Sequence, residues 1–222
     1  VCLRRQGQFV ESRDLLEQAA RLARLSADQG RETLALAEMA RTLCDAGRFE
    51  ESRRKAKEAL QQAIAISSRR GELAAQLALA DGGRQTGLLT EARYHAVQAV
   101  ELTTLIHQPA AHADALVILG LIYAALDQRA EAVSTLTRAA ELAESLGTRV
   151  FLVLAQAGLA RVGEPVDGQA LLAHARAIDT PPILWQGLLS SGICAATSGD
   201  TPAAETAYRE AIEVIGQLRG NL

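Results

Sequence analysis

Apolar side chains recur three and four residues apart along almost the whole chain. Two stretches show the pattern well: Leu36, Met39, Ala40 and Leu43 in one, and Leu16, Ala19, Leu22 and Ala23 in the other. This spacing places the apolar residues on one face of a helix, with polar residues on the opposite face. The pattern therefore predicts a succession of amphipathic helices.

Turn-like residues separate these stretches at regular intervals. They are Gly7, Gly47, Gly87, Asp127, Gly163 and Gly199, spaced 40, 40, 40, 36 and 36 residues apart. Five residues after each of them the side chain is small, at Ser12, Ser52, Ala92, Ala132, Gly168 and Ala204. Twelve residues after each stands an alanine: Ala19, Ala59, Ala99, Ala139, Ala175 and Ala211. Such a period predicts repeated helical hairpins, each with one helix before the turn residue and one after it.

The small residues have a structural meaning, because they let two helix backbones approach to about 8 Å. We therefore expect Ala99 and Ala139 to be buried at helix crossings. Gly and Pro between the units are predicted to end the second helix of each pair, at Gly30, Gly71, Pro109, Gly147 and Pro181-Pro182. The pattern gives about eleven helices, preceded by a partial one over residues 1–6.

Three places depart from the pattern. Gln156 replaces a small residue, Gly82-Gly83 lies inside a predicted helix, and Gly168 falls in a second helix expected to begin near Val166. Glycine inside a helix costs about 1 kcal/mol relative to alanine. These places are predicted to pack loosely or to act as flexible joints, unless they reflect mere drift in a tolerant repeat.

The repeat resembles the tetratricopeptide repeat (TPR). Its clearest match is Leu116-x-x-Leu119-Gly120-x-x-Tyr123 followed by Ala132 and Ala139, and a looser copy is Leu188-x-x-Ser191-Gly192-x-x-Ala195 followed by Ala204 and Ala211. The resemblance covers nearly the whole chain, although units of 40 residues exceed the usual 34. It implies an all-α, right-handed α-α superhelix of five to six helix hairpins. Long units of this kind are familiar in bacterial multidomain regulators and signalling scaffolds.

Composition agrees with an all-α fold. The chain has 222 residues, of which 43 are Ala and 33 are Leu, two strong helix formers. Only 3% of the residues are aromatic, which disfavours a β-sandwich or barrel. We interpret residues 1–222 as a single solenoid. Because it begins with Val1 instead of Met, it reads as a piece of a longer protein.

Charge and cysteine usage indicate a cytoplasmic protein without a membrane or nucleic-acid partner. Three scattered cysteines, Cys2, Cys44 and Cys194, do not form a disulfide framework. The longest apolar run, residues 115–126, is too short for a bilayer span of about 20 residues. The net charge is −3, and the one dense basic cluster, at residues 53–57, is interpreted as a solvated helix face beside acidic residues.

The sequence contains no recognisable catalytic or metal-binding motif. His107 and His112 straddle Pro109, so a single helix cannot present both, and no Cys lies at metal-ligand spacing from a His. We therefore predict no enzyme activity, no metal and no cofactor. Trp185, the sole Trp, is expected either to pack between units or to anchor a partner, because Trp is enriched in interface hot spots.

The resemblance implies a protein-interaction module with a concave binding face. Carried over residue by residue, the candidate face comprises Leu34, Arg41, Asp45, Asp81, Arg84, Asp114, Val117, Leu121, Val153, Ala157, Leu189 and Ile193. Its early part is charged and its later part aliphatic. An apolar groove suits a peptide or an amphipathic helix. The alternative is that the aliphatic residues pack against their own neighbouring units. Chaperone-binding relatives hold the C-terminal carboxylate of their ligand with a Lys/Asn pattern. This pattern is absent here, so chaperone tails are not expected as ligands.

Two further expectations concern the whole molecule. The second helix from Gln8 to Ala27 carries Phe9, Leu15, Leu16, Leu22 and Leu25 with little of its partner helix present, so this N-terminal edge is predicted to self-associate. A second function hypothesis is a ligand- or peptide-sensing regulatory region of a larger bacterial transcription regulator or signalling ATPase. Neighbouring domains in the full reading frame would distinguish it from a scaffold.

Overall fold

The computed structural model describes residues 2–219 and is built from helices alone over that range. The helices are α1 (Cys2–Arg5), α2 (Phe9–Leu25), α3 (Gln29–Asp45), α4 (Phe49–Ala65), α5 (Arg69–Gln85), α6 (Leu89–Leu105), α7 (Pro109–Ala125), α8 (Arg129–Ser145), α9 (Arg149–Arg161), α10 (Gly168–Ile178), α11 (Pro181–Thr197) and α12 (Thr201–Arg219). The predicted all-α solenoid is confirmed, with eleven full helices after a partial one.

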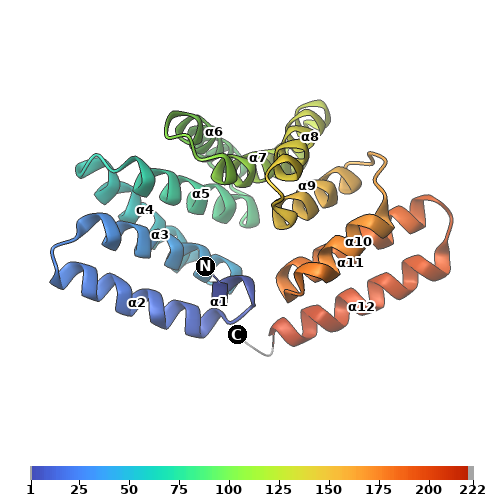
Figure 1. Cartoon of the computed structure of the whole chain (residues 1–222), viewed down its shortest axis with the longest axis horizontal. Helices are drawn as coiled ribbons and strands as arrows, with labels where there is room; N and C mark the ends of the chain where they lie inside the picture. The colour runs from blue at the N-terminus through green and yellow to red at the C-terminus, as the bar shows by residue number, and fades with distance from the viewer. Residues whose placement is uncertain (1, 220–222) are drawn as a thin grey trace.

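The helices form five complete hairpins, from α3–α4 to α11–α12, preceded by the short α1 and its partner α2. Each helix packs on the next one along the chain, and the first helices also pack on one another, α3 on α5, α5 on α7, α7 on α9 and α9 on α11. Figure 1 shows that the hairpins follow an arch whose two ends approach each other. Contacts between α1 and α11 connect these ends.

Left-handed residues end the helices at both kinds of turn. The six predicted turn residues all have positive φ, between 60° at Asp127 and 84° at Gly199. The second helices end in the same way, at Ala27, Ser67, His107, Gly147 and Asp179. The left-handed residue lets the next N–H close the helix, as when the N–H of Asp28 donates to the Ala23 carbonyl at 2.8 Å.

The predicted boundaries between units lie within a few residues of the observed ones, but four of the five residues do not end the preceding helix as expected. Only Gly147 ends a helix, whereas Pro109 and Pro181 occupy the first position of the following one. Proline suits that position because its missing N–H has no partner there anyway. Gly30 and Gly71 lie in the first turn of the next helix. A Cβ at Gly71 would lie 2.7 Å from Thr33 Cγ2, so the requirement there is for space.

The alanines twelve residues after each turn lie at helix crossings. Ala59, Ala99, Ala139 and Ala175 are each 0% exposed, and Ala211 is 4% exposed. Ala19 is the exception and is exposed, because the four-residue α1 covers only one end of α2. The prediction for Ala99 and Ala139 is confirmed, and Ala19 supplies a matched position without a crossing helix.

Of the three predicted loose or flexible places, only the one at Gln156 packs less extensively than its neighbours. Helix α5 continues through Gly82-Gly83, and a Cβ on Gly83 would lie 3.0 Å from that of Ala92, so the glycine serves close packing. Gly168 is the first residue of α10, after the N-cap Asp167, and does not interrupt a helix. At Gln156 the side-chain Oε1 is buried without a hydrogen-bond partner among the described residues. There α9 and α10 pack less extensively than the other complete hairpins.

Ala139→Leu should overpack the crossing between α8 and its neighbours and lower the free energy of unfolding by about 1–3 kcal/mol. Ala139 contacts a buried cluster that includes Ala113, Leu116 and Ala155, so the added atoms have no space. Urea denaturation followed by circular dichroism measures the loss. Ala19→Leu, at the equivalent exposed position, is the control and should change stability little; equal losses for the two variants would contradict this packing.

Several charges on the outer surface are paired. In the basic cluster, Arg53 contacts Glu91 at 2.7 Å, Lys55 contacts Glu58 at 3.0 Å, and Lys57 lies 3.7 Å from Glu91.

Cys44 and Cys194 are free thiols. None of the described helices combines the length and the hydropathy that crossing a bilayer requires.

Candidate functional site

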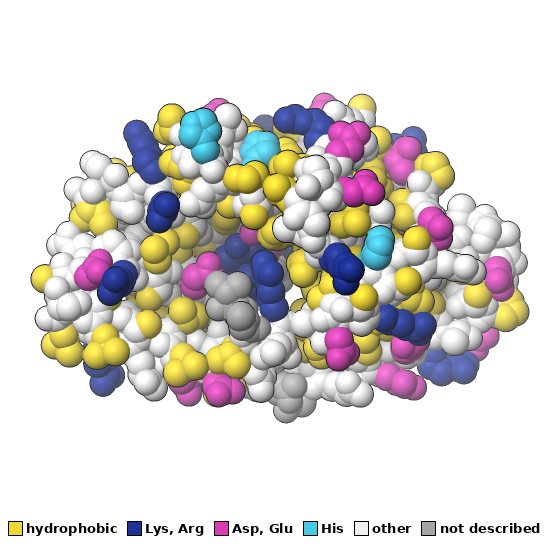
Figure 2. All heavy atoms as spheres, viewed as in Figure 1, with side chains coloured by type: hydrophobic (Ala, Val, Ile, Leu, Met, Phe, Trp, Pro, Cys, Tyr) yellow, Lys and Arg dark blue, Asp and Glu magenta, His cyan; other side chains and the backbone are white. Residues whose placement is uncertain are grey.

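The inner side of the arch encloses a cavity of about 540 Å³. Its wall is formed by the first helices of the repeats, α1, α3, α5, α7, α9 and α11, together with one residue of α2 and the end of α12. In Figure 2, Lys and Arg side chains gather in the hollow at the middle of the visible face. The volume lies within the range of about 300–1,000 Å³ that is typical of ligand pockets.

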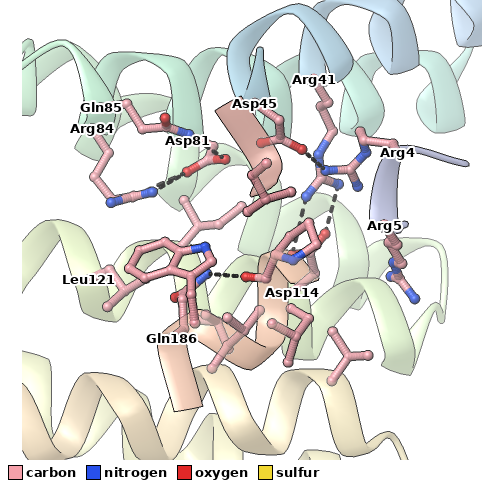
Figure 3. Close-up of a pocket in the computed structure, with 18 of the residues that line it drawn as sticks. Arg4, Arg5, Arg41, Asp45, Asp81, Arg84, Gln85, Asp114, Leu121 and Gln186 are labelled. Carbon is pink, nitrogen blue, oxygen red and sulfur yellow. Dashed lines mark hydrogen bonds and ion pairs between the residues drawn. The ribbon is translucent and has the colours of Figure 1, made fainter. Parts of the chain in front are cut away.

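Three ion pairs form the charged wall of the cavity. Arg4 donates to Asp45 at 2.7 Å, and Arg84 donates to Asp81 at 2.7 Å. The third pair joins helices α3 and α7, since both terminal nitrogens of Arg41 reach Asp114, at 2.8 and 3.4 Å. Figure 3 shows these groups pointing toward one another across the upper part of the cavity. Residues 41 positions or more apart in sequence are thus fixed by charge-assisted hydrogen bonds.

Burial and neighbouring charges shift the pKa values of these groups. Burial alone would lower the pKa of Arg41, but the carboxylates of Asp114 and Glu38 raise it above its usual value. Burial would raise the pKa of Asp81, but the guanidinium groups of Arg84 and Arg41 lower it. For Asp45 burial dominates and raises the pKa despite the contact with Arg4. The cluster is therefore strongly coupled and largely desolvated.

Three arginines on the wall, Arg5, Arg161 and Arg219, have no carboxylate partner within 4 Å among residues 2–219, and Arg219 is exposed at the end of α12. Arg5 lies with its guanidinium carbon 5.6 Å from the centre of the Phe151 ring, a cation–π contact. Burial lowers the pKa of Arg5, and the cation of Arg4 lowers it further. Partial burial also lowers the pKa of Arg161, together with the nearby cation of Arg84. Arg5 is half-buried and Arg161 is more exposed, and neither forms an ion pair with a described carboxylate.

The opposite wall is apolar. It comprises Val117, Ile118, Leu121, Val150, Phe151, Leu154, Ile183 and Trp185, with Ile215 and Leu218 from the last helix. Trp185 is half-buried, and it also packs against the cluster of Leu188, Ala211 and Val214. It therefore packs within the array, as one of the two expectations had it, and it also faces the cavity, while a role as partner anchor stays a prediction.

The structure brings together seven of the twelve candidate face residues. Arg41, Asp45, Asp81, Arg84, Asp114, Val117 and Leu121 line the cavity, whereas Leu34, Val153, Ala157, Leu189 and Ile193 lie outside it. Val153 and Ala157 are 0% and 1% exposed, so they pack against their own neighbouring units, as the alternative interpretation had it. Leu34 is 37% exposed away from the cavity.

The misplaced residues share one cause, which is the coiling of the array. The cavity touches the last turns of α3 and α5, the middle of α7, and mainly the first turns of α9 and α11. The candidate face was predicted by counting a fixed number of residues from the Leu-Gly position. That count does not change along the array as the cavity does, so the prediction did not include Phe151, Leu154 and Trp185. Arg4 and Arg5 were missed because the meeting of the two ends is a tertiary feature without a local sequence signal.

The N-terminal edge is only partly apolar and open. Phe9 is 6% exposed and lines the cavity, and Leu16 is half-buried. Leu15, Leu22 and Leu25 are 50%, 66% and 80% exposed. Self-association through these three leucines remains a prediction, and Phe9 takes no part in it.

Comparison with known proteins identifies similar helical repeats. A tetratricopeptide repeat model matches residues 115–150, from α7 through α8 to the start of α9. A Rap protein, solved in complex with Competence and Sporulation Factor, superposes with a TM-score of 0.81 over 99% of this chain, at 15% identity. The chain is a TPR-type repeat protein.

A second similar structure supports the same TPR fold. BtubC from P. vanneervenii matches with a TM-score of 0.65 at 19% identity, over 99% of this chain and 93% of that one. This TPR-type chain spans 62% of the length of the Rap protein. No curated protein matches the sequence. At these identities the likeness establishes the fold, and the fold supports a protein-interaction scaffold.

Proposed function

We propose that the cavity on the inner side of this TPR array binds a short peptide segment of a partner protein. The observation that carries the proposal is the composition of the wall, with arginine–aspartate pairs on one side and aliphatic and aromatic side chains on the other. Peptide backbones need hydrogen-bonding partners and their side chains need apolar contacts, and this wall offers both. A Rap protein of similar fold was solved in complex with Competence and Sporulation Factor, which supports ligand binding by an array of this kind.

The closure of the arch favours the second hypothesis, a sensing region within a larger protein. A Cβ on Gly7 would lie 2.7 Å from Leu218 Cδ2, so the turn after α1 and the end of α12 are in close contact. Both ends also contribute to the cavity wall, through Arg4, Arg5, Ile215 and Leu218. A ligand in the cavity would therefore contact both ends and bias how closely they approach, which is what a sensor requires.

Leu121→Asp should abolish peptide binding without unfolding the protein. Leu121 is half-buried on the apolar wall, so an added carboxylate meets solvent in the empty cavity but opposes an apolar ligand group. Labelled protein is applied to an array of random ten-residue peptides, and the retained sequences are titrated in solution. We expect wild type to bind a defined subset of the peptides. Leu121→Asp should bind that subset at least tenfold more weakly, and its circular dichroism spectrum should be unchanged.

Leu105→Asp is the matched control, because Leu105 is 62% exposed at the end of α6 and lies outside the cavity. It should retain the same peptides as wild type. Retention of the subset by folded Leu121→Asp, or its equal loss in both variants, would show that the cavity is not the binding site.

A further inference from the structure

The charges on the cavity wall do not balance. Six arginines line it, Arg4, Arg5, Arg41, Arg84, Arg161 and Arg219, against the three aspartates Asp45, Asp81 and Asp114. Each aspartate pairs with one arginine, so the aspartates are fully used. The chain as a whole carries a net charge of −3, so the cationic excess is local to this cavity. A concave site lined by one sign of charge concentrates ligands of the opposite sign.

Three of the six arginines have no carboxylate partner in residues 2–219: Arg5, Arg161 and Arg219. Arg219 is exposed at the end of α12, and the other two cations lie at opposite ends of one helix. Arg5 stacks on Phe151 near the start of α9, and Arg161 is its last residue. Ten residues of α-helix separate Phe151 from Arg161, which corresponds to about 15 Å at 1.5 Å per residue. One carboxylate therefore cannot reach both cations. An extended peptide covers the same distance in about five residues at 3.3 Å each.

The wall between these cations is apolar. Val150 and Leu154 project from α9 itself, and Leu121 and Trp185 contribute from α7 and α11. A ligand that bridges the two cations must therefore pass over aliphatic and aromatic side chains. Its middle part gains by being apolar, because burial of apolar surface contributes about 25 cal/mol per Å².

We infer that the cavity binds an extended acidic peptide of about five residues, with one carboxylate at Arg5, a second at Arg161, and apolar side chains between them on the wall formed by α7, α9 and α11. This inference rests on the proposed peptide-binding function and specifies its ligand. Each carboxylate supplies the anion that its arginine lacks. The lowered pKa of half-buried Arg5 agrees, since a partly buried cation without an anion is destabilised.

The test uses the emission of Trp185, the only Trp of the chain, which lines the cavity. Three acetylated and amidated pentapeptides are titrated into the full chain. The first, Glu-Leu-Ala-Leu-Glu, places carboxylates four residues apart. The second replaces both Glu residues with Gln, and the third, Glu-Glu-Ala-Leu-Leu, keeps the composition but brings the carboxylates together. We expect the first peptide to bind about tenfold tighter than either of the others, and added salt to reduce that advantage.

Arg5→Gln and Arg161→Gln should each weaken binding of the first peptide about tenfold and leave binding of the Gln peptide unchanged. Circular dichroism of each variant verifies that the array is folded. Arg209→Gln is the control, because Arg209 pairs with Glu205 on the exposed face of α12 and does not line the cavity. It should leave all three affinities unchanged.

The outcomes separate the inference from the proposed function. Equal binding of the Glu and Gln peptides would overturn the acidic ligand and leave peptide binding in place. Insensitivity to both Arg substitutions would overturn the assigned subsites. If citrate competes as strongly as the first peptide, the site takes a small anion and the peptide length is wrong. If no pentapeptide binds the folded protein, the acidic inference fails, and the array experiment with Leu121→Asp decides the proposed function independently.

Discussion

Asp114→Ala should lower the free energy of unfolding by about 3–5 kcal/mol, because it leaves the Arg41 cation buried without its anion. The side chains of Arg41 and Asp114 are 14% and 12% exposed, and the pair ties α3 to α7 across α5. Losing one partner of such a pair is costlier than losing both. Arg41→Leu combined with Asp114→Leu should therefore be more stable than Asp114→Ala alone.

Urea denaturation monitored by circular dichroism gives these free energies. The control is Glu205→Gln, which breaks a pair whose two side chains are both 68% exposed and should cost less than about 1 kcal/mol. Asp114→Asn keeps an acceptor oxygen and should recover part of the loss. A loss for Asp114→Ala no greater than that for Glu205→Gln would mean that the pair contributes nothing beyond a surface contact.

The local part of this fold could be predicted from the sequence. The spacing of Gly7, Gly47 and Gly87 fixed where first helices end, because a left-handed residue is required there and glycine adopts that conformation most readily. The ends of the second helices were misplaced, because Ala27 and Ser67 adopt the same conformation without being glycine. Nothing in their local sequence indicates this, and the packing of the next helix imposes it.

The candidate site was predictable only where it follows from the repeat. In α3 and α5 the same part of the helix, its last turns, lines the cavity. The repeat therefore correctly predicted the charged residues Arg41, Asp45, Asp81 and Arg84. Further along, coiling of the array moves the cavity toward the starts of α9 and α11, and offsets counted from the motif no longer apply. Arg5 reaches the cavity because the first and last repeats lie close together. That closeness results from the small rotation between each repeat and the next, added over the whole array.

Leu136→Ala should cost about 2–5 kcal/mol of unfolding free energy, and its cost should depend on the residue at position 120. Leu136 is 0% exposed, and its side chain lies against the backbone of α7 at Gly120 and of α9 at Gly158. A Cβ on Gly120 would lie 2.6 Å from Leu136 Cγ, so Gly120→Ala alone must also destabilise the protein. Once Leu136 is Ala, the clash is gone, and Gly120→Ala should add little cost or even fill part of the space.

Urea denaturation of the two single variants and the double variant measures this coupling, with exposed Leu105→Ala as the control for leucine truncation. Strictly additive losses would show that Leu136 does not occupy the space left by the Leu-Gly motif of α7.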